Sequence, residues 1–93
     1  MRIAVTDGID PRAKSKLEEM GHYVQEKHFS KEELLAGCIS DFDIVVVRSA
    51  TKIISDVIRA NSGEDALFSM VIRAGVGVDN IDIKEAGANN ILV

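Results

Sequence analysis

The chain has 93 residues, of which 46% are hydrophobic and 28% are charged, and its formal net charge is -4. This length supports one small domain, and the composition is that of a folded globular protein rather than a disordered chain. The negative charge argues against binding to nucleic acid or to an anionic membrane surface, since both require a basic patch. We therefore expect no nucleic-acid partner and no membrane partner.

The cysteine content and the amino terminus indicate the compartment. Cys38 is the only cysteine, so it cannot form an internal disulfide, and we interpret it as a half-buried small residue. The apolar run over residues 1–5 is too short for a signal peptide or a membrane span. We expect a cytoplasmic protein.

The first predicted elements are a strand over residues 2–6 and a helix that follows it. The β-branched run stops at Asp7-Gly8, which indicates a buried strand leading into a turn. Asp10 can cap a helix that begins at Pro11, because the fixed φ of proline suits the first helical position. Apolar residues then recur at helical spacing until Gly21 ends the pattern.

The middle of the chain predicts a strand, a short helix and a second strand. Residues 22–28 alternate weakly, as in a strand. Residues 30–33 have the spacing of a capping box, which opens a short helix through Leu34 and Leu35. Residues 42–47 form the most apolar run of the chain, and such a run is typical of a strand covered on both faces in a parallel sheet.

The last part of the chain continues this alternation. It predicts a helix, a polar loop, a strand, a helix and the start of a fifth strand, at residues 55–60, 61–65, 68–72, 82–88 and 91–93. Asn89 and Asn90 can adopt the left-handed conformation that ends the last helix.

The alternation of strand and helix with short links predicts the fold class. It implies right-handed crossovers, a parallel sheet and helices on both faces. We predict an α/β, flavodoxin-like, three-layer α/β/α domain over residues 1–93, with about five strands in the order 2-1-3-4-5. Ligands of such sheets bind beyond the carboxyl ends of the strands.

Polar and glycine-rich segments follow three of the predicted strands. They read TDG, RSATK and RAGVGVDN, and the last two follow strands that are neighbours in the predicted order. Together they would place a guanidinium, hydroxyls and glycine-rich amides around one crevice, which suits carboxylate or phosphate groups. Taken singly, Arg48 and Lys52 are equally explained as solvated ends of a strand and a helix, and the glycines as turn residues. The glycine segment lacks the dinucleotide fingerprint, since Asn80 stands where the third glycine belongs.

The strings VVVRSATK and RAGVGVDNID resemble signatures of the D-isomer-specific 2-hydroxyacid dehydrogenases. TDGID, SKEELL and the final ILV are similar to that family too, so the resemblance covers the whole chain. Asn90 departs from the family by replacing a glycine, which is tolerable because asparagine accepts the same backbone conformation.

The resemblance implies that the chain is the substrate-binding, or lid, domain of an NAD-dependent oxidoreductase whose NAD-binding domain is absent from these 93 residues. The expected substrate is a small anionic 2-hydroxy acid, 3-phosphoglycerate, oxidised in serine biosynthesis. Arg48 would hold the phosphate, and Ser49 and Ala50 would line the pocket. The amides around Gly75, Val76 and Gly77 would receive the carboxylate, and Val76 would also approach the nicotinamide.

By the same resemblance, the arginine, glutamate and histidine of the chemistry lie in the following cofactor domain and just after it. We therefore predict no catalytic residue and no metal site here, and an inactive fragment. We predict that His22 and His28 are structural or exposed and lie away from the crevice.

Two non-enzymatic hypotheses use the same fold. A regulatory receiver domain needs an acceptor aspartate after the third strand, where this chain has Arg48 and Ser49. A dimerisation module would use an apolar surface left bare by the absent domain, and the chain would then be a homo-oligomer.

Overall fold

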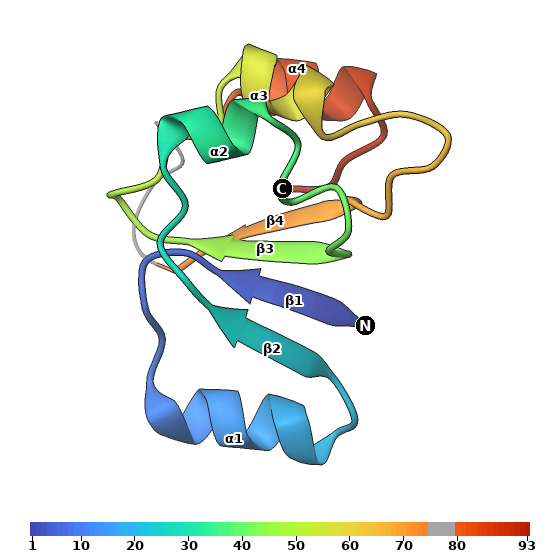
Figure 1. The fold of residues 1–93 in the computed structure, drawn as a ribbon. Helices are drawn as coiled ribbons and strands as arrows, with labels where there is room; N and C mark the ends of the chain where they lie inside the picture. Colours follow the sequence, from blue (N-terminus) through green and yellow to red (C-terminus); the bar gives the residue numbers. More distant parts are fainter. Residues whose placement is uncertain (75–79) are drawn as a thin grey trace.

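The computed structural model describes residues 1–74 and 80–93, whose eight elements alternate strand and helix (Figure 1). The strands are β1 (Arg2–Val5), β2 (Tyr23–Glu26), β3 (Ile44–Val47) and β4 (Met70–Arg73). The helices are α1 (Pro11–Glu19), α2 (Lys31–Leu35), α3 (Ser55–Ala60) and α4 (Ile83–Ala88). Only β4 extends beyond its predicted range, by one residue at its carboxyl end.

The strands form one parallel sheet in the order β2-β1-β3-β4, which confirms the predicted topology for these four strands. Leu92 takes the fifth place, beside β4, through a parallel bridge with Met70. Its backbone N–H donates to the Ser69 carbonyl at 2.9 Å, and its carbonyl accepts from Val71 N–H at 2.8 Å. The expected fifth strand is thus present as a single bridge.

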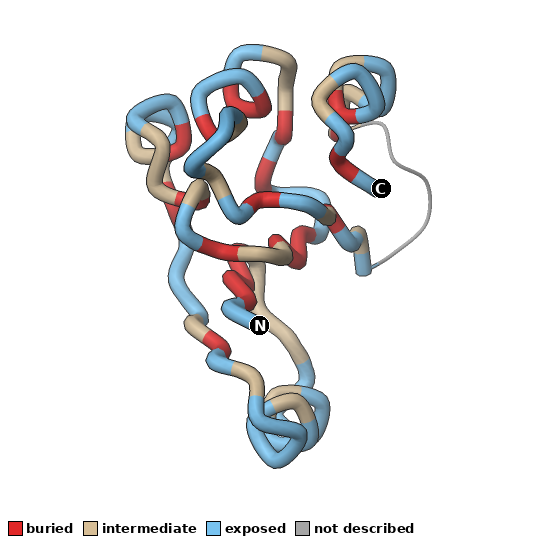
Figure 2. Tube along the Cα trace, turned by 90° about the vertical axis from the view of Figure 1, so that its right-hand side faces the viewer, coloured by how far each residue is buried: buried red, intermediate tan, exposed pale blue. Residues whose placement is uncertain are grey.

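Helices cover both faces of the sheet. In Figure 1, α1 lies alone on one face, and α2, α3 and α4 lie on the other. Successive side chains of β3 point to opposite faces of the sheet and pack into different clusters. Val45 and Val47 belong to the large core cluster beneath the three helices, and Val46 belongs to a smaller cluster with Ile3 and Val5. All three valines are buried, as predicted for a strand covered on both faces. In Figure 2 the buried residues, in red, lie in the middle of the domain, whereas α1, at the bottom, has none.

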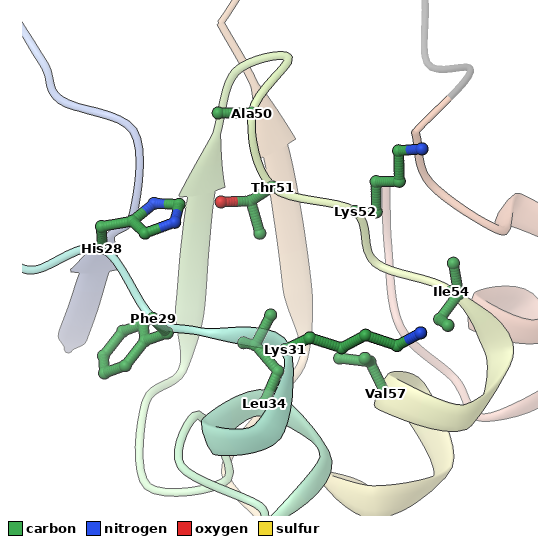
Figure 3. Close-up of a pocket in the computed structure, with 9 residues that line it drawn as sticks. All are labelled: His28, Phe29, Lys31, Leu34, Ala50, Thr51, Lys52, Ile54 and Val57. Carbon is green, nitrogen blue, oxygen red and sulfur yellow. The ribbon is translucent and has the colours of Figure 1, made fainter.

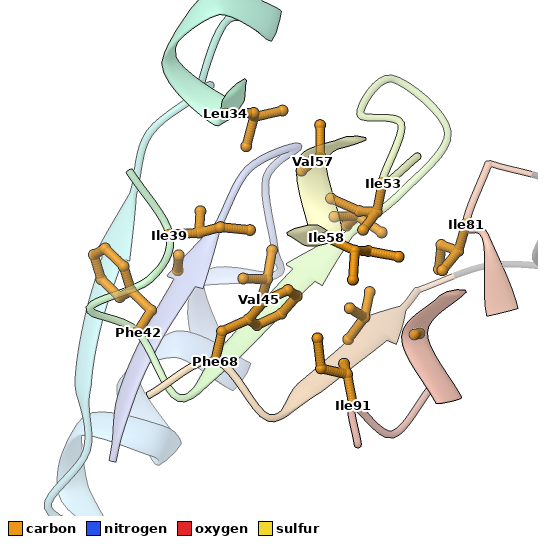
Figure 4. Packing of buried hydrophobic residues seen from close by; sticks show 14 of the residues in the cluster. Leu34, Ile39, Phe42, Val45, Ile53, Val57, Ile58, Phe68, Ile81 and Ile91 are labelled. Carbon is orange, nitrogen blue, oxygen red and sulfur yellow. The ribbon is translucent and has the colours of Figure 1, made fainter. Parts of the chain in front are cut away.

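The large cluster forms the main core. Figure 4 shows side chains from the sheet, the helices and the loops converging there. Ile39, Ile53, Ile58 and Val71 are all fully buried in it. Since Ile53 lies in the segment that follows β3, this core also anchors the base of the loop predicted to bind substrate.

Helix ends follow the sequence signals. The Asp10 carboxylate accepts from Arg12 N–H at 2.8 Å. Ser30 and Glu33 form both bonds of the predicted capping box. After α4 only Asn90 is left-handed, with φ 60°, whereas the preceding Asn89 has φ -107°. Asn90 therefore adopts the conformation that a glycine would otherwise supply.

Asn61 departs from its predicted place in a polar loop, because it is fully buried at the end of α3. Its side-chain Oδ1 accepts from Ile39 N–H at 3.0 Å. Its Nδ2 donates to the carbonyls of Leu34 at 2.9 Å and Val57 at 2.8 Å. One amide side chain thus joins α2, α3 and the segment that precedes β3.

Within the described parts of the chain, no helix is long and apolar enough to cross a membrane.

Candidate functional site

Three loops meet at the carboxyl edge of the sheet, and a buried carboxylate connects them. Asp7 follows β1, and its side chain is 3% exposed. Its Oδ2 accepts from the backbone N–H groups of Arg48 at 2.7 Å and Thr51 at 3.1 Å. Its Oδ1 accepts from the Thr51 hydroxyl at 2.6 Å. Asp7 therefore fixes the backbone of the loop after β3 at both of its ends.

The hydrogen bonds to Asp7 also determine its ionisation. Burial raises the pKa of the carboxyl, but the bonds from the Thr51 hydroxyl and from the backbone of Arg48 and Thr51 outweigh it. The nearby imidazole of His28 acts in the same direction. The pKa of Asp7 therefore lies below its usual value of 3.8, because each donor favours the charged form.

The same loop is held from the other side by Asn80. Its side-chain Nδ2 donates to the carbonyls of Arg48 at 2.7 Å and Thr51 at 2.6 Å. Its own carbonyl accepts from Ile53 N–H at 2.8 Å, and Ile53 forms a parallel bridge with Ile81. The segment after β3 thus lies against the residues that precede α4, as the predicted strand order requires.

The predicted phosphate-binding loop is exposed. Arg48, Ser49 and Ala50 are all exposed, whereas the following Thr51 is buried. The backbone of Arg48 is held by Asp7 and Asn80, but no bond joins its guanidinium to another of the described residues. The other predicted site residues, Gly75, Val76 and Gly77, lie outside the described residues.

His28 lies elsewhere than predicted. It follows β2 at the carboxyl edge, where its Nδ1 lies 3.3 Å from the Thr6 carbonyl and 3.6 Å from Asp7 Oδ1. The prediction that it is exposed is confirmed, but the prediction that it lies away from the crevice is wrong. Parallel pairing of β2 with β1 brings the residue after β2 beside the residue after β1. His22 lies at the opposite end of the sheet, with Nδ1 3.2 Å from the amino terminus.

A pocket of about 290 Å³ lies on the helical side of this edge (Figure 3). Its residues come from the segment after β2, from α2, from the loop after β3 and from α3. They are His28, Phe29, Lys31, Leu34, Ala50, Thr51, Lys52, Ile54 and Val57. Ala50 is the one predicted site residue among them. Arg48 and Ser49 are not part of this pocket.

Other reactive groups of the described chain lie away from this edge or are unsuited to chemistry. Cys38 is half-buried, as predicted, and burial raises the pKa of its thiol. A raised pKa leaves little thiolate at neutral pH, so Cys38 is a weak nucleophile. The described residues contain no group of three or more histidine, cysteine or acidic side chains that could hold a metal ion.

The described residues do not fit the pyrophosphate of NAD. Asn80, at the third position of the glycine pattern, already uses its side-chain amide to hold the loop after β3. The first turn of α4 is capped by the Asp82 carboxylate, which accepts from Glu85 N–H at 3.0 Å. An anion near that turn would meet this negative charge, whereas nucleotide-binding helices leave the first turn free for phosphate.

Sequence reasoning missed three residues that organise this edge, namely Asp7, Thr51 and Asn80. They lie in strings that resemble the family, but no local pattern predicts the role of their side chains. The available signal was an aspartate directly after one strand and hydroxyl or amide residues after two others.

Comparisons with known proteins agree with this architecture. Residues 3–93 match the family described as D-isomer specific 2-hydroxyacid dehydrogenase, catalytic domain. The crystal structure of PH0520 protein from Pyrococcus horikoshii superposes with a TM-score of 0.82 at 25% identity, covering 99% of this chain and 27% of that one. D-lactate dehydrogenase from Escherichia coli superposes with a TM-score of 0.78 at 14% identity, covering 100% and 30%.

Curated relatives match the whole chain. D-3-phosphoglycerate dehydrogenase from Sus scrofa is 42% identical over 93 residues, which are 99% of this chain and 16% of the relative. The enzyme of the same name from Methanocaldococcus jannaschii is also 42% identical, over 100% of this chain and 17% of its own length. The chain thus spans about a sixth of the length of these relatives. By sequence and fold, this chain belongs to the D-isomer specific 2-hydroxyacid dehydrogenase family.

Proposed function

We propose that this chain is the substrate-binding, or lid, domain of an NAD-dependent D-3-phosphoglycerate dehydrogenase. The observation that carries the proposal is the 42% identity, over all 93 residues, to enzymes of that name from a mammal and an archaeon. A hydroxypyruvate reductase from Thermotoga maritima is 38% identical over 95 residues, so the preference among 2-hydroxy acids is the part of the proposal that most needs a test.

Arg48 is the residue that we assign to the substrate phosphate. Its backbone is fixed on both sides by Asp7 and Asn80, while its side chain is exposed. A guanidinium presents a planar fork that matches phosphate oxygens. Ser49 and Ala50 would line the substrate site beside Arg48, and the amides around Gly75, Val76 and Gly77 would receive the carboxylate.

We further propose that NAD is held mainly by a domain outside these 93 residues, with Val76 approaching the nicotinamide. NAD accepts the hydride when it is bound. This chain's own residues orient the acid and neutralise its charge. The proton-transfer groups would belong to the second domain, so the chain alone should oxidise nothing.

The assignment of Arg48 is tested by replacing it with alanine in a longer parent enzyme. The kcat/KM for 3-phosphoglycerate should fall about 10- to 100-fold, as expected for losing hydrogen bonds to a charged group. The kcat/KM for D-glycerate, which lacks the phosphate, should change little. Arg12→Ala is the matched control, because Arg12 is exposed on α1 and pairs only with Asp10 among the described residues. An unchanged preference for the phosphorylated substrate would remove the assignment.

Inactivity of the separate chain is tested by incubating it with NAD and 3-phosphoglycerate. No NADH should form at protein concentrations at which the parent enzyme is active. NADH formation by the pure chain would show that its own residues suffice for the chemistry and would overturn this part of the proposal.

A further inference from the structure

The pocket between α2, α3 and the loop after β3 has an uneven distribution of charge. Among the described residues, its lining contains two lysines and one histidine but no aspartate or glutamate, in a chain with a net charge of -4. The buried carboxylate of Asp7 lies directly behind the lining, bonded to the Thr51 hydroxyl at 2.6 Å and 3.6 Å from His28 Nδ1. Glu33, in the α2 capping box, is paired with Lys27 at 2.8 Å and does not line the pocket. Because His28 faces Asp7, the uncompensated positive charge of the pocket comes from Lys31 and Lys52.

The basic groups lie around an apolar floor. Phe29, Leu34 and Val57 are buried, and Ile54 is half-buried beside them. Lys31 and Lys52 are exposed, and neither forms an ion pair with another described residue. In Figure 3 the stem of Lys31 runs along the apolar side chains, and the His28 ring and the Thr51 hydroxyl point toward one another.

These features define the ligand. The volume of the pocket, about 290 Å³, is at the lower end of the range of small-molecule sites, roughly 300–1,000 Å³. An apolar floor favours a hydrophobic group, and unpaired ammonium groups at the rim favour an anion. We propose that this pocket is a second ligand site, specific for a small monoanion that joins a carboxylate to an apolar group.

The proposed site is separate from the one assigned to the substrate. Ala50, Thr51 and Lys52 of the loop after β3 line it, and of these only Ala50 is also assigned to the substrate site. Arg48 and Ser49 are not in its lining. Because Asp7 and Asn80 both hold Thr51, which lines the pocket, and Arg48, which precedes it, a ligand in the pocket would pack against the back of the substrate loop. The proposal does not depend on the identity of the substrate.

Benzoate and its neutral isostere benzamide test the proposal on the 93-residue chain. Backbone amide resonances followed by NMR should shift for residues 28–34 and 50–57. Affinity should be millimolar, since a ligand with so few atoms gains little binding energy. Benzoate should bind about threefold or more tightly than benzamide, the size expected for exposed charge pairs.

Substitutions separate the role of charge from that of shape. The double variant Lys31→Met and Lys52→Met should weaken benzoate about threefold or more and leave benzamide unchanged. Lys84→Met, on the exposed side of α4, is the control with the same kind of charge loss and should leave both ligands unchanged. Arg48→Ala should not affect benzoate.

Three results would overturn the proposal. The first is no saturable shift in these segments up to about 50 mM benzoate, well above the affinity expected for so small a ligand. The second is equal binding of benzamide and benzoate. The third is displacement of benzoate by 3-phosphoglycerate together with loss of benzoate binding in Arg48→Ala, since the pocket would then be part of the substrate site. Failure of 3-phosphoglycerate to bind anywhere would contradict the proposed function and leave this inference intact.

Discussion

The carboxylate of Asp7 and the hydroxyl of Thr51 lie 2.6 Å apart, although 44 positions separate them in the sequence. The pairing follows from the sheet order, because β1 and β3 are neighbours and their carboxyl ends meet at the same edge. Asp7 also accepts two backbone N–H groups of the same loop. The shape of the exposed loop that carries Arg48 therefore depends on a buried carboxylate on another strand.

Replacing Asp7 with asparagine should destabilise the domain. An amide has one acceptor oxygen, so at least one of the three donors now bonded to the carboxylate would lose its partner. Urea unfolding should show a free energy of unfolding lower by about 1–3 kcal/mol. Asp41→Asn, at an exposed position, should stay within about 0.5 kcal/mol of the wild type. Equal stability of both variants would contradict the role given to Asp7.

The same carboxylate predicts a pH dependence. The folded-state pKa of Asp7 lies below its usual 3.8, so the unfolded chain binds the proton more tightly. The stabilisation is therefore fully present above the unfolded pKa and is lost as the pH falls through the folded one. The difference in unfolding free energy between wild type and Asp7→Asn should shrink as the pH is lowered from about 6 to about 3. A difference that grows on acidification would have the wrong sign.

Asn61→Ala should be more costly than changes elsewhere in its loop. The substitution leaves the buried Ile39 N–H without its acceptor and removes two donors from neighbouring carbonyls. Thermal or urea unfolding should show a loss of about 2–3 kcal/mol. Asp65→Ala, at an exposed position of the same loop, should change stability by less than about 0.5 kcal/mol. Similar small effects for both would show that the buried amide is dispensable.

Asn80→Ala tests the second support of the loop. Loss of the two side-chain bonds to the Arg48 and Thr51 carbonyls should speed amide hydrogen exchange in residues 48–53, while exchange in α1 stays unchanged. Combined with Asp7→Asn in a double-mutant cycle, it should be non-additive by about 0.5 kcal/mol or more, because both residues hold one loop. Strict additivity would mean that the two supports act independently.

Local patterns predicted the fold well because each element carries its own signal. Such signals are local, because each one specifies the helix or strand in which it lies. They are the aspartate and proline at the start of α1, the capping box of α2 and the continuous valines of β3. Alternation of strands and helices with short links then leaves few topologies. The fifth strand was predicted from its apolar residues, but Leu92 pairs only as a single bridge.

The site was less predictable, because its contacts join residues far apart in the sequence. Local polarity placed Asn61 in a solvated loop, but tertiary packing buries it and satisfies its amide. The weak alternation of residues 22–28 predicts a strand that includes His28, but β2 ends at Glu26 and leaves His28 at the carboxyl edge. The role of Asp7 depends on partners 41 and 44 residues away, which no local pattern contains.

We propose above that the exposed loop led by Arg48 binds the phosphate of a small acid. Titrating the chain with 3-phosphoglycerate and with D-glycerate, while following the backbone amide resonances of Arg48, Ser49 and Ala50, tests it most directly. We expect shifts at these amides, and 3-phosphoglycerate should saturate them at a concentration about tenfold lower or more than D-glycerate, since charge-assisted bonds to phosphate are the stronger ones. Unchanged amides, or equal affinity for the two acids, would contradict it.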